Sequence, residues 1–498
     1  MMESPSDNLR QRVGLILSPL VCACVWFVPL SGLNPAAHHL LAILAAVVTL
    51  WVTEAIPLAV TALLGPTLCV VVGVSEAKVA YKGFADPIIF LFLGSFLLAE
   101  AMLHHGLNRR IAFTLLGMPA FGKNPARVLL GFGLVTALIS MWVSNTATTA
   151  MMFPVGVAIL TEMARQASRQ AGREIDYTQL RFGTGLMLMA AFASSIGGLA
   201  TPVGTPPNLI GIGLIEKHLG TKISFFQWVS FGLPLALVLL AFLVVHLKRA
   251  CPADAGLTTG GDWIEQEKAK LGPIRRGEWN VLFAFCFMVS LWLLPGVVVL
   301  ITGSDSHYAK LLNTHLPEAT VALLGATLLF VLPINFARGE FTLSWRNAER
   351  IDWGTILLFG GGLALGEMMF STGLATWIGE GLAHLLNAKT SLGLVILFTV
   401  IAVLVSETTS NAASATMVVP VAIAVAQAAG VDPLRPALAA CLGASMGFML
   451  PVSTPPNAIV YGSRCIPLSK MIAQGAALDA AGIVAVVAVV EWLVPLVF

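Results

Sequence analysis

Long apolar stretches recur along the whole chain and are separated by short polar segments. Residues 13–28, 39–52, 280–300 and 476–498 are the clearest of these stretches. A hydrocarbon layer of about 30 Å needs roughly 20 apolar residues in a helical span. A single hydrophobic core does not explain stretches that continue over the full length. The pattern therefore predicts an all-α polytopic membrane protein.

Composition agrees with this pattern. The chain has 498 residues, of which 57% are hydrophobic and 11% are charged, whereas about a quarter of the residues in a soluble domain are charged. The net charge of +2 gives no reason to expect a nucleic-acid partner. The seven Cys residues are scattered and mostly lie in apolar stretches, so they indicate neither a disulfide framework nor a metal site. Membrane lipid is the expected surrounding.

Four sequence blocks occur twice, in the same order. The longest reads SMWVSNTATTAMMFPV in the first half and SETTSNAASATMVVPV in the second, without a gap. The four pairs are residues 59–68 with 319–328, Asp86 with Asp352, residues 140–155 with 406–421, and residues 202–208 with 451–457. Self-similarity in a fixed order predicts a duplicated fold.

The repeat divides the chain into units. We expect a first transmembrane helix in residues 1–38, the first repeat in 39–249, a cytoplasmic linker in 250–277 and the second repeat in 278–498. Each repeat has one long apolar segment with a polar middle, which we interpret as a re-entrant hairpin, and one helix interrupted by two prolines. The hairpins are predicted at 126–165 and 391–430, and the broken helices at 182–215 and 433–463.

The distribution of positive charge tests this topology, because cytoplasmic loops of membrane proteins are enriched in Lys and Arg. With a cytoplasmic N-terminus and two re-entrant hairpins, 21 of the 28 Lys and Arg residues face the cytoplasm and seven face outside. This asymmetry favours about eleven crossings in two inverted halves. Inverted repeats are typical of secondary transporters. The expected location is the inner (cell) membrane of a bacterium.

Two pairs of helix breaks carry the candidate chemistry. Residues 205–206 and 454–455 read Thr-Pro; Pro cannot continue a helix, but it starts one well after a Thr N-cap. Residues 144–145 and 410–411 read Ser-Asn and stand at the predicted hairpin tips. Four half-helix N-termini near the membrane midplane would together supply about +2 charge, comparable with a dianion. Helix dipoles are the predicted source of positive potential, because no Lys or Arg lies in these motifs.

The same breaks leave backbone carbonyls unpaired, and neutral oxygen ligands suit Na⁺. Ser140 lies one helical turn before Ser144, as Ser406 does before Ser410, so each pair shares a helix face. Each half can thus build one sodium site, and two or more Na⁺ would be co-transported. The predicted ligands are Ser140, Ser144, Asn145 and the Gly204 carbonyl in the first half, and Ser406, Ser410, Asn411 and the Ser453 carbonyl in the second. One isolated Ser-Asn pair would be a packing feature, but the duplication favours a functional role.

At these motifs the chain resembles the divalent anion:sodium symporters, which carry dicarboxylates, citrate or sulfate. The resemblance covers nearly the whole chain and includes the segment WVTEAIPL at 51–58, ahead of the third helix. It implies a homodimer that works as an elevator, with a scaffold domain and a moving transport domain. Ala412 stands where some members have Thr, which leaves the preferred anion open. The resemblance implies substrate contacts at Asn145, Thr146, Asn411, Ala412, Thr205, Pro206, Thr454 and Pro455.

The predicted function is sodium-coupled symport of a C4-dicarboxylate such as succinate, malate or fumarate, and not an enzymatic reaction. Sulfate or citrate as the substrate, and exchange of dicarboxylates, stay open as alternatives. An intramembrane hydrolase is a more remote one, because no His or acid pair accompanies the tip Ser residues as a nucleophile requires. Four acids in or near apolar stretches are interpreted mainly as paired or interfacial groups rather than a proton relay, although Glu407 could tune the second cation site. These acids are Glu54, Glu100, Glu367 and Glu407.

Overall fold

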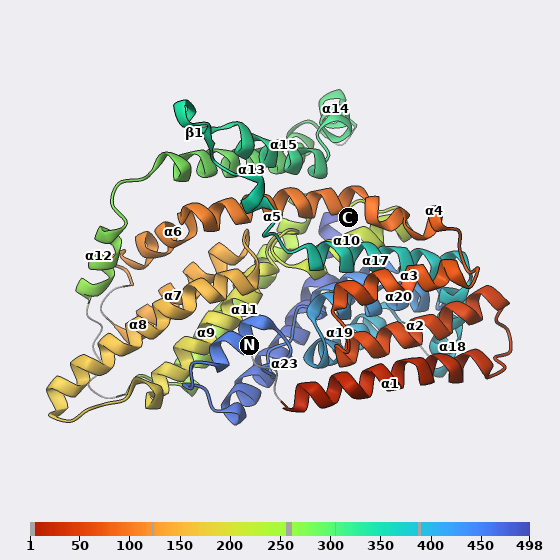
Figure 1. The fold of residues 1–498 in the computed structure, drawn as a ribbon, viewed down its shortest axis with the longest axis horizontal. Coiled ribbons are helices and arrows are strands. Elements are labelled where there is room, and N and C mark those ends of the chain that lie inside the picture. Colours follow the sequence, from red (N-terminus) through yellow and green to blue (C-terminus); the bar gives the residue numbers. More distant parts are fainter. Residues whose placement is uncertain (1–4, 122–123, 255–260, 304, 387–389) are drawn as a thin grey trace.

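The computed structural model describes residues 5–121, 124–254, 261–303, 305–386 and 390–498, which form a helical molecule (Figure 1). The elements of the first half are α1 (Pro5–Phe27), α2 (Pro35–Thr53), α3 (Leu58–Val71), α4 (Ala77–Ala80), the 3-10 helix η1 (Lys82–Ala85), α5 (Pro87–His105), α6 (Leu107–Leu116), α7 (Pro125–Ser140), α8 (Asn145–Ala171), η2 (Tyr177–Gln179), α9 (Arg181–Gly198), α10 (Pro206–Leu219) and α11 (Phe225–Ala250). The elements of the second half are α12 (Gly261–Lys270), α13 (Arg276–Thr302), α14 (His307–His315), α15 (Glu318–Val331), β1 (Pro333–Asn335), η3 (Phe336–Arg338), β2 (Glu340–Phe341), α16 (Trp345–Ala348), α17 (Trp353–Ser371), α18 (Leu374–Leu386), α19 (Ser391–Thr408), α20 (Asn411–Ala428), α21 (Leu434–Gly443), α22 (Pro455–Tyr461), α23 (Leu468–Trp492) and α24 (Val494–Val497).

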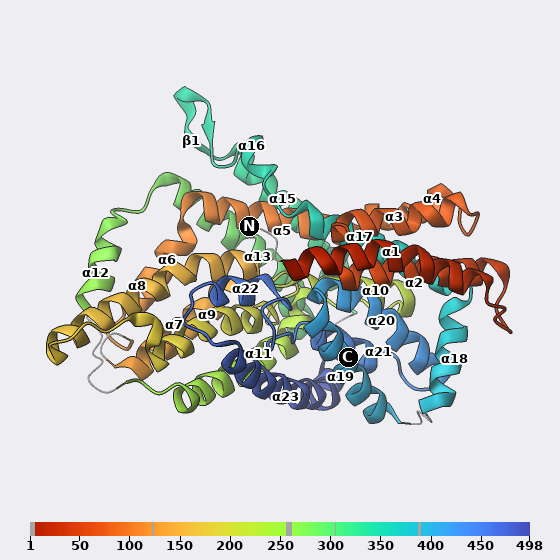
Figure 2. The same cartoon turned by 60° about the horizontal axis from the view of Figure 1, so that its bottom comes forward.

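Within the described ranges, ten helices are long and apolar enough to cross a membrane, or eleven if the pair α14–α15, bent by 58°, counts as one span. The four clearest apolar stretches of the sequence became α1, α2, α13 and the α23–α24 pair. The polytopic all-α class is therefore confirmed. The strands that the structure describes are β1 and β2, a short antiparallel ribbon that projects from the helical body (Figure 2).

Several helices begin where a polar residue precedes a proline. Asn34, Asp86 and Asn124 each accept a hydrogen bond from a backbone N–H in the first turn of α2, α5 and α7. Proline suits the next position, because its fixed φ matches a helix and its missing N–H would have no partner there. These caps decide locally where the apolar stretches become helical.

The predicted hairpin and broken-helix segments each form two helices with a break between them. Residues 126–165 fall in α7 and α8, and residues 391–430 fall in α19 and α20. Residues 182–215 form α9 and α10, and residues 433–463 form α21 and α22. Because α8, α19 and α20 are each long and apolar enough to span a membrane, helix length does not distinguish a re-entrant hairpin from two crossings. The re-entrant topology stays a prediction.

The two halves contact each other in equivalent pairs. α5 packs against α15 and α17 against α3, while α10 packs against α20 and α22 against α8. Glycines permit the closest approaches. A Cβ on Gly94 would lie 2.5 Å from the Ala322 carbonyl carbon, and one on Gly361 would lie 2.2 Å from the Ala62 carbonyl oxygen. The corresponding helices of each half thus touch backbone to backbone at matching places.

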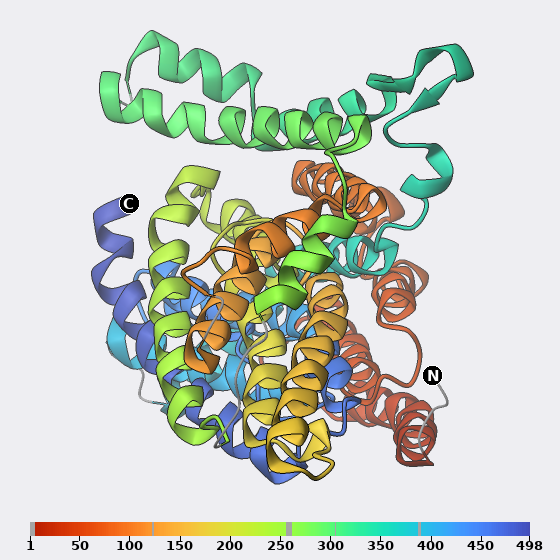
Figure 3. The ribbon, with the colours of Figure 1, turned by 90° about the vertical axis from the view of Figure 1, so that its left-hand side faces the viewer.

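An outer layer of helices covers one side of the bundle. α13 and α15 lie against each other and against α5, and Figure 3 shows this green layer above the rest of the molecule. Only 22% of the apolar window of α13 and 11% of that of α1 is buried inside the chain. Apolar helix faces without protein cover fit a lipid environment.

The predicted linker holds a helix that the sequence analysis did not anticipate. α12 packs against α6, and Arg109 forms an ion pair with Glu267 at 3.3 Å. Arg110 pairs with Glu278 at 2.6 Å and donates to the Gly272 carbonyl at 2.9 Å. The end of the linker is therefore held against the first half, while its residues 255–260 and residues 1–4 of the first unit lie outside the described residues.

The glycine contact between α17 and α3 gives a first prediction. Gly361→Ala should lower the free energy of unfolding by about 1–3 kcal/mol, because the new methyl group has to displace a backbone carbonyl. Gly381→Ala in α18 is the matched control, since a Cβ there meets nothing within 4 Å. Thermal midpoints of both variants in detergent would check this. Equal midpoints for the two variants would contradict the close packing of α17 on α3.

Candidate functional site

The first predicted tip lies between α7 and α8. Ser140, fully buried, ends α7, and its hydroxyl donates to Asn145 Oδ1 at 2.8 Å. Ser144 is the N-cap of α8, and its hydroxyl accepts from the Ala147 N–H at 3.3 Å. The side chain of Thr201, from the break after α9, donates to the Met141 carbonyl at 2.5 Å. The tip is thus held by its own polar residues and by the neighbouring break.

The second tip repeats this arrangement. The Ser406 hydroxyl lies 2.7 Å from Asn411 Oδ1 and 2.7 Å from the Ala444 carbonyl. Ser410 is the N-cap of α20 and accepts from the Ala413 N–H at 3.2 Å. The Ser–Asn hydrogen bond is therefore present in both halves with nearly the same length. This bond orients the amide oxygens of Asn145 and Asn411 in the same way.

The residues before the two prolines behave differently in the two breaks. Thr205 and Thr454 both occupy N-cap positions with extended backbones. The Thr454 hydroxyl accepts from the Asn457 N–H at 3.4 Å, as an N-cap does. The Thr205 hydroxyl makes no such bond and instead accepts from Asn145 Nδ2 at 3.5 Å. The expectation that both Thr side chains cap their helices is correct only in the second half.

Three predicted ligands of the first cation site converge around Gly198. A Cβ on Gly198 would lie 2.6 Å from Asn145 Oδ1 and 3.1 Å from the Gly204 carbonyl oxygen. Ser140 joins this group through its bond to Asn145. Ser144 is more exposed and its hydroxyl faces the first turn of α8. The prediction that Ser140 and Ser144 share one helix face is wrong, because α7 ends at Ser140 and Ser144 caps the next helix; the same holds for the equivalent serines of α19 and α20. Because glycine has no Cβ, position 198 leaves open the space between these oxygens.

The second site has the same plan around Gly447. A Cβ on Gly447 would lie 3.1 Å from Ser406 Oγ and 3.3 Å from Asn411 Oδ1. The Ser453 hydroxyl is directed elsewhere, because it donates to a carboxylate oxygen of Glu407 at 2.6 Å. The Ser453 carbonyl stays a predicted ligand.

The predicted substrate residues differ in exposure. Asn145 and Asn411 are half-buried, and Thr146 and Pro455 are exposed. The buried members are Ala412, Thr205 and Thr454, and Pro206 is half-buried. Since α22 packs on α8 and α10 on α20, each broken helix lies beside the hairpin of the other half. Hydrogen bonds join each tip to the break of its own half, and the helix contacts then bring the two halves together.

Sequence analysis missed two asparagines that stabilise the breaks. Asn208 Nδ2 donates to the Gly198 and Thr201 carbonyls at 2.9 and 2.8 Å. Asn457 Nδ2 donates to the carbonyls of Gly447 and Leu450 at 3.1 and 3.0 Å. Both side chains are fully buried. They end the duplicated block Pro-Val-x-Thr-Pro-Pro-Asn, so a signal was available.

Two of the four acids in or near apolar stretches follow the interpretation as paired groups. Glu54 forms an ion pair with Arg10 at 2.6 Å, and Glu367 with Lys217 at 2.8 Å. Glu407 is 3% exposed, and its carboxylate accepts hydrogen bonds from the Met449 and Leu450 N–H groups of the second break. Its contact with Ser453 places it next to the second predicted site, and its role in cation binding stays a prediction.

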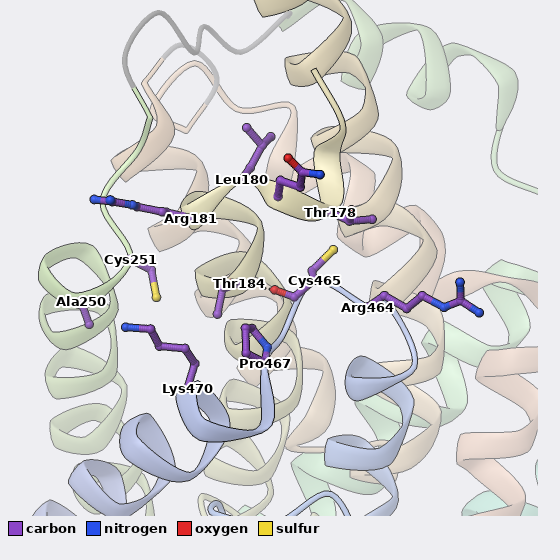
Figure 4. A pocket seen from close by; sticks show the side chains of 11 residues that line it. Thr178, Leu180, Arg181, Thr184, Ala250, Cys251, Arg464, Cys465, Pro467 and Lys470 are labelled. Carbon is purple, nitrogen blue, oxygen red and sulfur yellow. Dashed lines mark hydrogen bonds between the residues drawn. The ribbon is translucent and has the colours of Figure 1, made fainter. Parts of the chain in front are cut away.

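A cavity of about 540 Å³ lies away from the tips, at the ends of α9 and α11 and before α23 (Figure 4). Lys470 extends across it toward Cys251, whereas Arg464 points away from it. Burial raises the pKa of the Cys251 and Cys465 thiols. This disfavours the thiolate form that a nucleophile requires, so the cavity gives no support to the hydrolase alternative.

The paired asparagines give a second prediction. Asn457→Ala should lower the free energy of unfolding by about 1–3 kcal/mol, because two buried carbonyls lose their donor. It should also raise the sodium concentration needed for half-maximal thermal stabilisation, since the carbonyl of Gly447 is no longer held. Asn313→Ala, at an exposed position of α14, is the control. A sodium requirement unchanged in Asn457→Ala would separate this asparagine from the cation site.

Comparisons with known proteins agree with the motifs. A family model described as "Sodium:sulfate symporter transmembrane region" matches residues 9–498. The sodium-dependent dicarboxylate transporter SdcS of Staphylococcus saprophyticus is 36% identical over 498 residues, covering 99% of this chain and 93% of that protein. SdcS of Staphylococcus aureus is 35% identical over 492 residues, covering 98% of this chain and 92% of that protein.

Two solved structures share the fold at low sequence identity. The YdaH transporter of Alcanivorax borkumensis superposes with a TM-score of 0.55 at 14% identity and covers 98% of both chains. MtrF of Neisseria gonorrhoeae, an antimetabolite efflux pump, gives 0.54 at 14% identity, covering 99% of this chain and 95% of that one. Both are transporters. Because the family model covers nearly the full length, the chain belongs to the sodium:sulfate symporter family, the divalent anion:sodium symporters that its motifs resemble.

Proposed function

We propose that the chain is a sodium-coupled symporter of C4-dicarboxylates such as succinate, malate or fumarate. The observation that carries this proposal is the duplicated cluster of neutral oxygens around Gly198 and Gly447. Uncharged hydroxyl, amide and carbonyl oxygens suit an alkali cation. The relatives named as sodium-dependent dicarboxylate transporters support the choice of ion and substrate class.

Bound sodium would complete the anion site. Among the described residues, no ion pair includes a residue of either tip. The positive potential must then come from helix N-termini and from the cations. Two sodium ions at the tips would neutralise a dianion, so sodium binds first and the dicarboxylate follows. Charge neutrality lets the loaded site cross the membrane at a lower cost than the separate ions.

The helix dipoles contribute less than the sequence suggested. α8, α10 and α20 have 27, 14 and 18 residues, whereas α22 has seven. α10 and α22 also start with two prolines, which have no N–H to offer to an anion. The N-termini of α8 and α20, which begin at Asn145 and Asn411, therefore supply the main donors. Because two of the four helix N-termini contribute little, the bound cations have to supply a larger share of the positive charge that faces the anion.

Symport is favoured over exchange because the candidate cation sites contain no basic side chain that could take the place of sodium. Sulfate is the second candidate substrate, since the family model is described as a sodium:sulfate symporter. The dicarboxylate is favoured because the relatives are named as sodium-dependent dicarboxylate transporters, and two tips of the same plan offer one binding position for each carboxylate. This argument also fits citrate less well, since a third carboxylate would need a further partner.

The transport cycle we propose is that of an elevator in a homodimer, with the N-terminus in the cytoplasm. The tips and breaks would move together as a transport domain against a scaffold. The ion pair between Lys217 of α10 and Glu367 of α17, at 2.8 Å, lies between these two parts. His218 stacks on Phe370 beside it, with ring centroids 3.9 Å apart. These contacts would have to break during the cycle.

Uptake into proteoliposomes tests the function. We expect succinate uptake to require an inward sodium gradient, and Asn145→Ala and Asn411→Ala to reduce it at least ~100-fold while the protein stays folded, because each loses a ligand for both ion and substrate. Asn313→Ala should keep full activity. Full uptake in sodium-free buffer with internal dicarboxylate would contradict symport, and sodium-dependent stabilisation by sulfate but not by succinate would contradict the substrate class.

The elevator proposal has its own test. Lys217→Cys and Glu367→Cys, combined in a protein without its seven native Cys, should be joined by a bifunctional methanethiosulfonate that spans the length of the two lost side chains; the crosslink should stop uptake, and reduction should restore it. Each single Cys variant is the control, and it should transport before and after this treatment. Undiminished uptake by a fully crosslinked protein would show that α10 does not move past α17.

A further inference from the structure

The cavity of about 540 Å³ at the ends of α9 and α11 has no part in the candidate transport site (Figure 4). Its walls come from both halves of the chain. The first half contributes η2, the start of α9 and the end of α11, and the second contributes the connection from α22 to α23. Both α11 and α23 are long and apolar enough to cross a membrane. The cavity therefore lies where two spans end and lipid headgroups begin.

The charged side chains of this cavity are all basic. Arg181, Arg464 and Lys470 line it, and none of the lining residues that the structure describes is an acid. In the view of Figure 4, the Arg181 and Lys470 side chains extend to the same side with Cys251 between them, and Arg464 points away. Within the described ranges, no ion pair includes any of the three basic residues. Two cations from different halves thus share one cavity without a carboxylate partner.

Two acids close in sequence to the cavity bind backbone groups instead. Asp176 accepts a hydrogen bond from the Thr178 N–H at 2.9 Å, and Asp254 accepts one from the Phe182 N–H at 3.5 Å. These carboxylates hold η2 and the first turn of α9, which are walls of the cavity. They do not form ion pairs with Arg181.

The wall from the second half is held in place by the first half. The Thr184 hydroxyl of α9 donates to the Cys465 carbonyl at 2.6 Å. The preceding residue, Arg464, has a φ of 62°, a left-handed conformation that is unfavourable for a residue with a side chain. The connection therefore keeps this shape through its contact with α9, and the cavity is a built feature of the fold.

The first turn of α23 adds neutral donors. Its N-cap, Pro467, lines the cavity and has no side-chain acceptor for the N–H groups of that turn. Such N–H groups and the helix dipole favour an anion at the start of a helix. They reinforce the charge of Lys470, which belongs to the same turn.

Exposed apolar side chains lie near the cavity on both spans. Val245 of α11 and Leu468 and Ile472 of α23 are between 38% and 48% exposed, and α11 packs against α23. A basic pocket at the ends of membrane helices is typical of a site for an anionic lipid headgroup. The apolar faces would then contact the acyl chains.

We propose that this cavity binds a phosphate group, with Arg181 and Lys470 as its main ligands. Basic side chains donate charge-assisted hydrogen bonds to phosphate oxygens. The phosphate belongs to an anionic phospholipid or to a free phosphate compound, and the apolar faces of α11 and α23 favour the phospholipid. The bound group joins the two halves, because Arg181 belongs to the first and Lys470 to the second. Sodium and the dicarboxylate take no part, so the inference does not depend on the proposed function.

Thermal unfolding of the purified protein in detergent tests this site with three probes. They are dioleoyl phosphatidylglycerol, dioleoylglycerol, which lacks the phosphate, and glycerol 3-phosphate, which lacks the acyl chains. Phosphatidylglycerol should raise the thermal midpoint and dioleoylglycerol should not. Arg181→Gln and Lys470→Gln should each raise the half-saturating phosphatidylglycerol concentration at least ~10-fold, because a charge-assisted hydrogen bond is lost. Lys248→Gln should keep the wild-type concentration, since Lys248 is an exposed basic residue at the end of α11 that does not line the cavity.

The probes also identify the source of the phosphate. Stabilisation by phosphatidylglycerol but not by glycerol 3-phosphate supports a phospholipid, and equal stabilisation by both supports a free phosphate compound, provided that the two cavity variants weaken it. Half-saturating concentrations that are equal in wild-type protein, Arg181→Gln and Lys470→Gln would overturn the proposal, as would equal stabilisation by dioleoylglycerol or none by either phosphate probe. Each variant is compared with its own midpoint without probe, so a change in basal stability does not hide the result.

Discussion

The structure depends on how the backbone carbonyls at the helix breaks find hydrogen-bond donors inside an apolar environment. Each break between α9 and α10, or between α21 and α22, leaves carbonyl groups without a helical N–H, and lipid offers no replacement. Asn208 and Asn457 meet this need by donating to two carbonyls each. Because those carbonyls belong to the turns that contain Gly198 and Gly447, the same hydrogen bonds that make the breaks tolerable also fix the oxygens around the candidate cation sites.

The duplication produces two sites of the same plan but different charge. In the first half, a neutral hydroxyl, that of Thr201, joins the break to the tip at the Met141 carbonyl. In the second half, the carboxylate of Glu407 makes this connection through two N–H groups and the Ser453 hydroxyl. The first predicted site therefore has only neutral groups around it, whereas the second lies beside the carboxyl group of Glu407.

Close backbone contacts explain why the two halves cannot separate. Gly94 against Ala322 and Gly361 against Ala62 bring α5 onto α15 and α17 onto α3. The contacts of α10 with α20 and of α22 with α8 combine the halves again around the tips. Each predicted cation site is built from residues of one half, and a helix of the other half packs against its hairpin helix: α22 on α8 and α10 on α20.

The sequence by itself determined the helical class, the near-complete set of apolar spans, the duplicated blocks and the positions of the helix breaks. These follow from local rules: apolar length, and proline or an N-cap residue at a helix start. Tertiary structure decided what depends on distant segments. It turned the Thr205 hydroxyl toward Asn145 instead of its own helix, gave Gly198 and Gly447 their place among the predicted ligands, and joined Glu407 to the Met449 and Leu450 N–H groups of the second break. Such contacts join helices that are far apart in sequence, and no periodicity along one segment encodes the partner that packing brings to it.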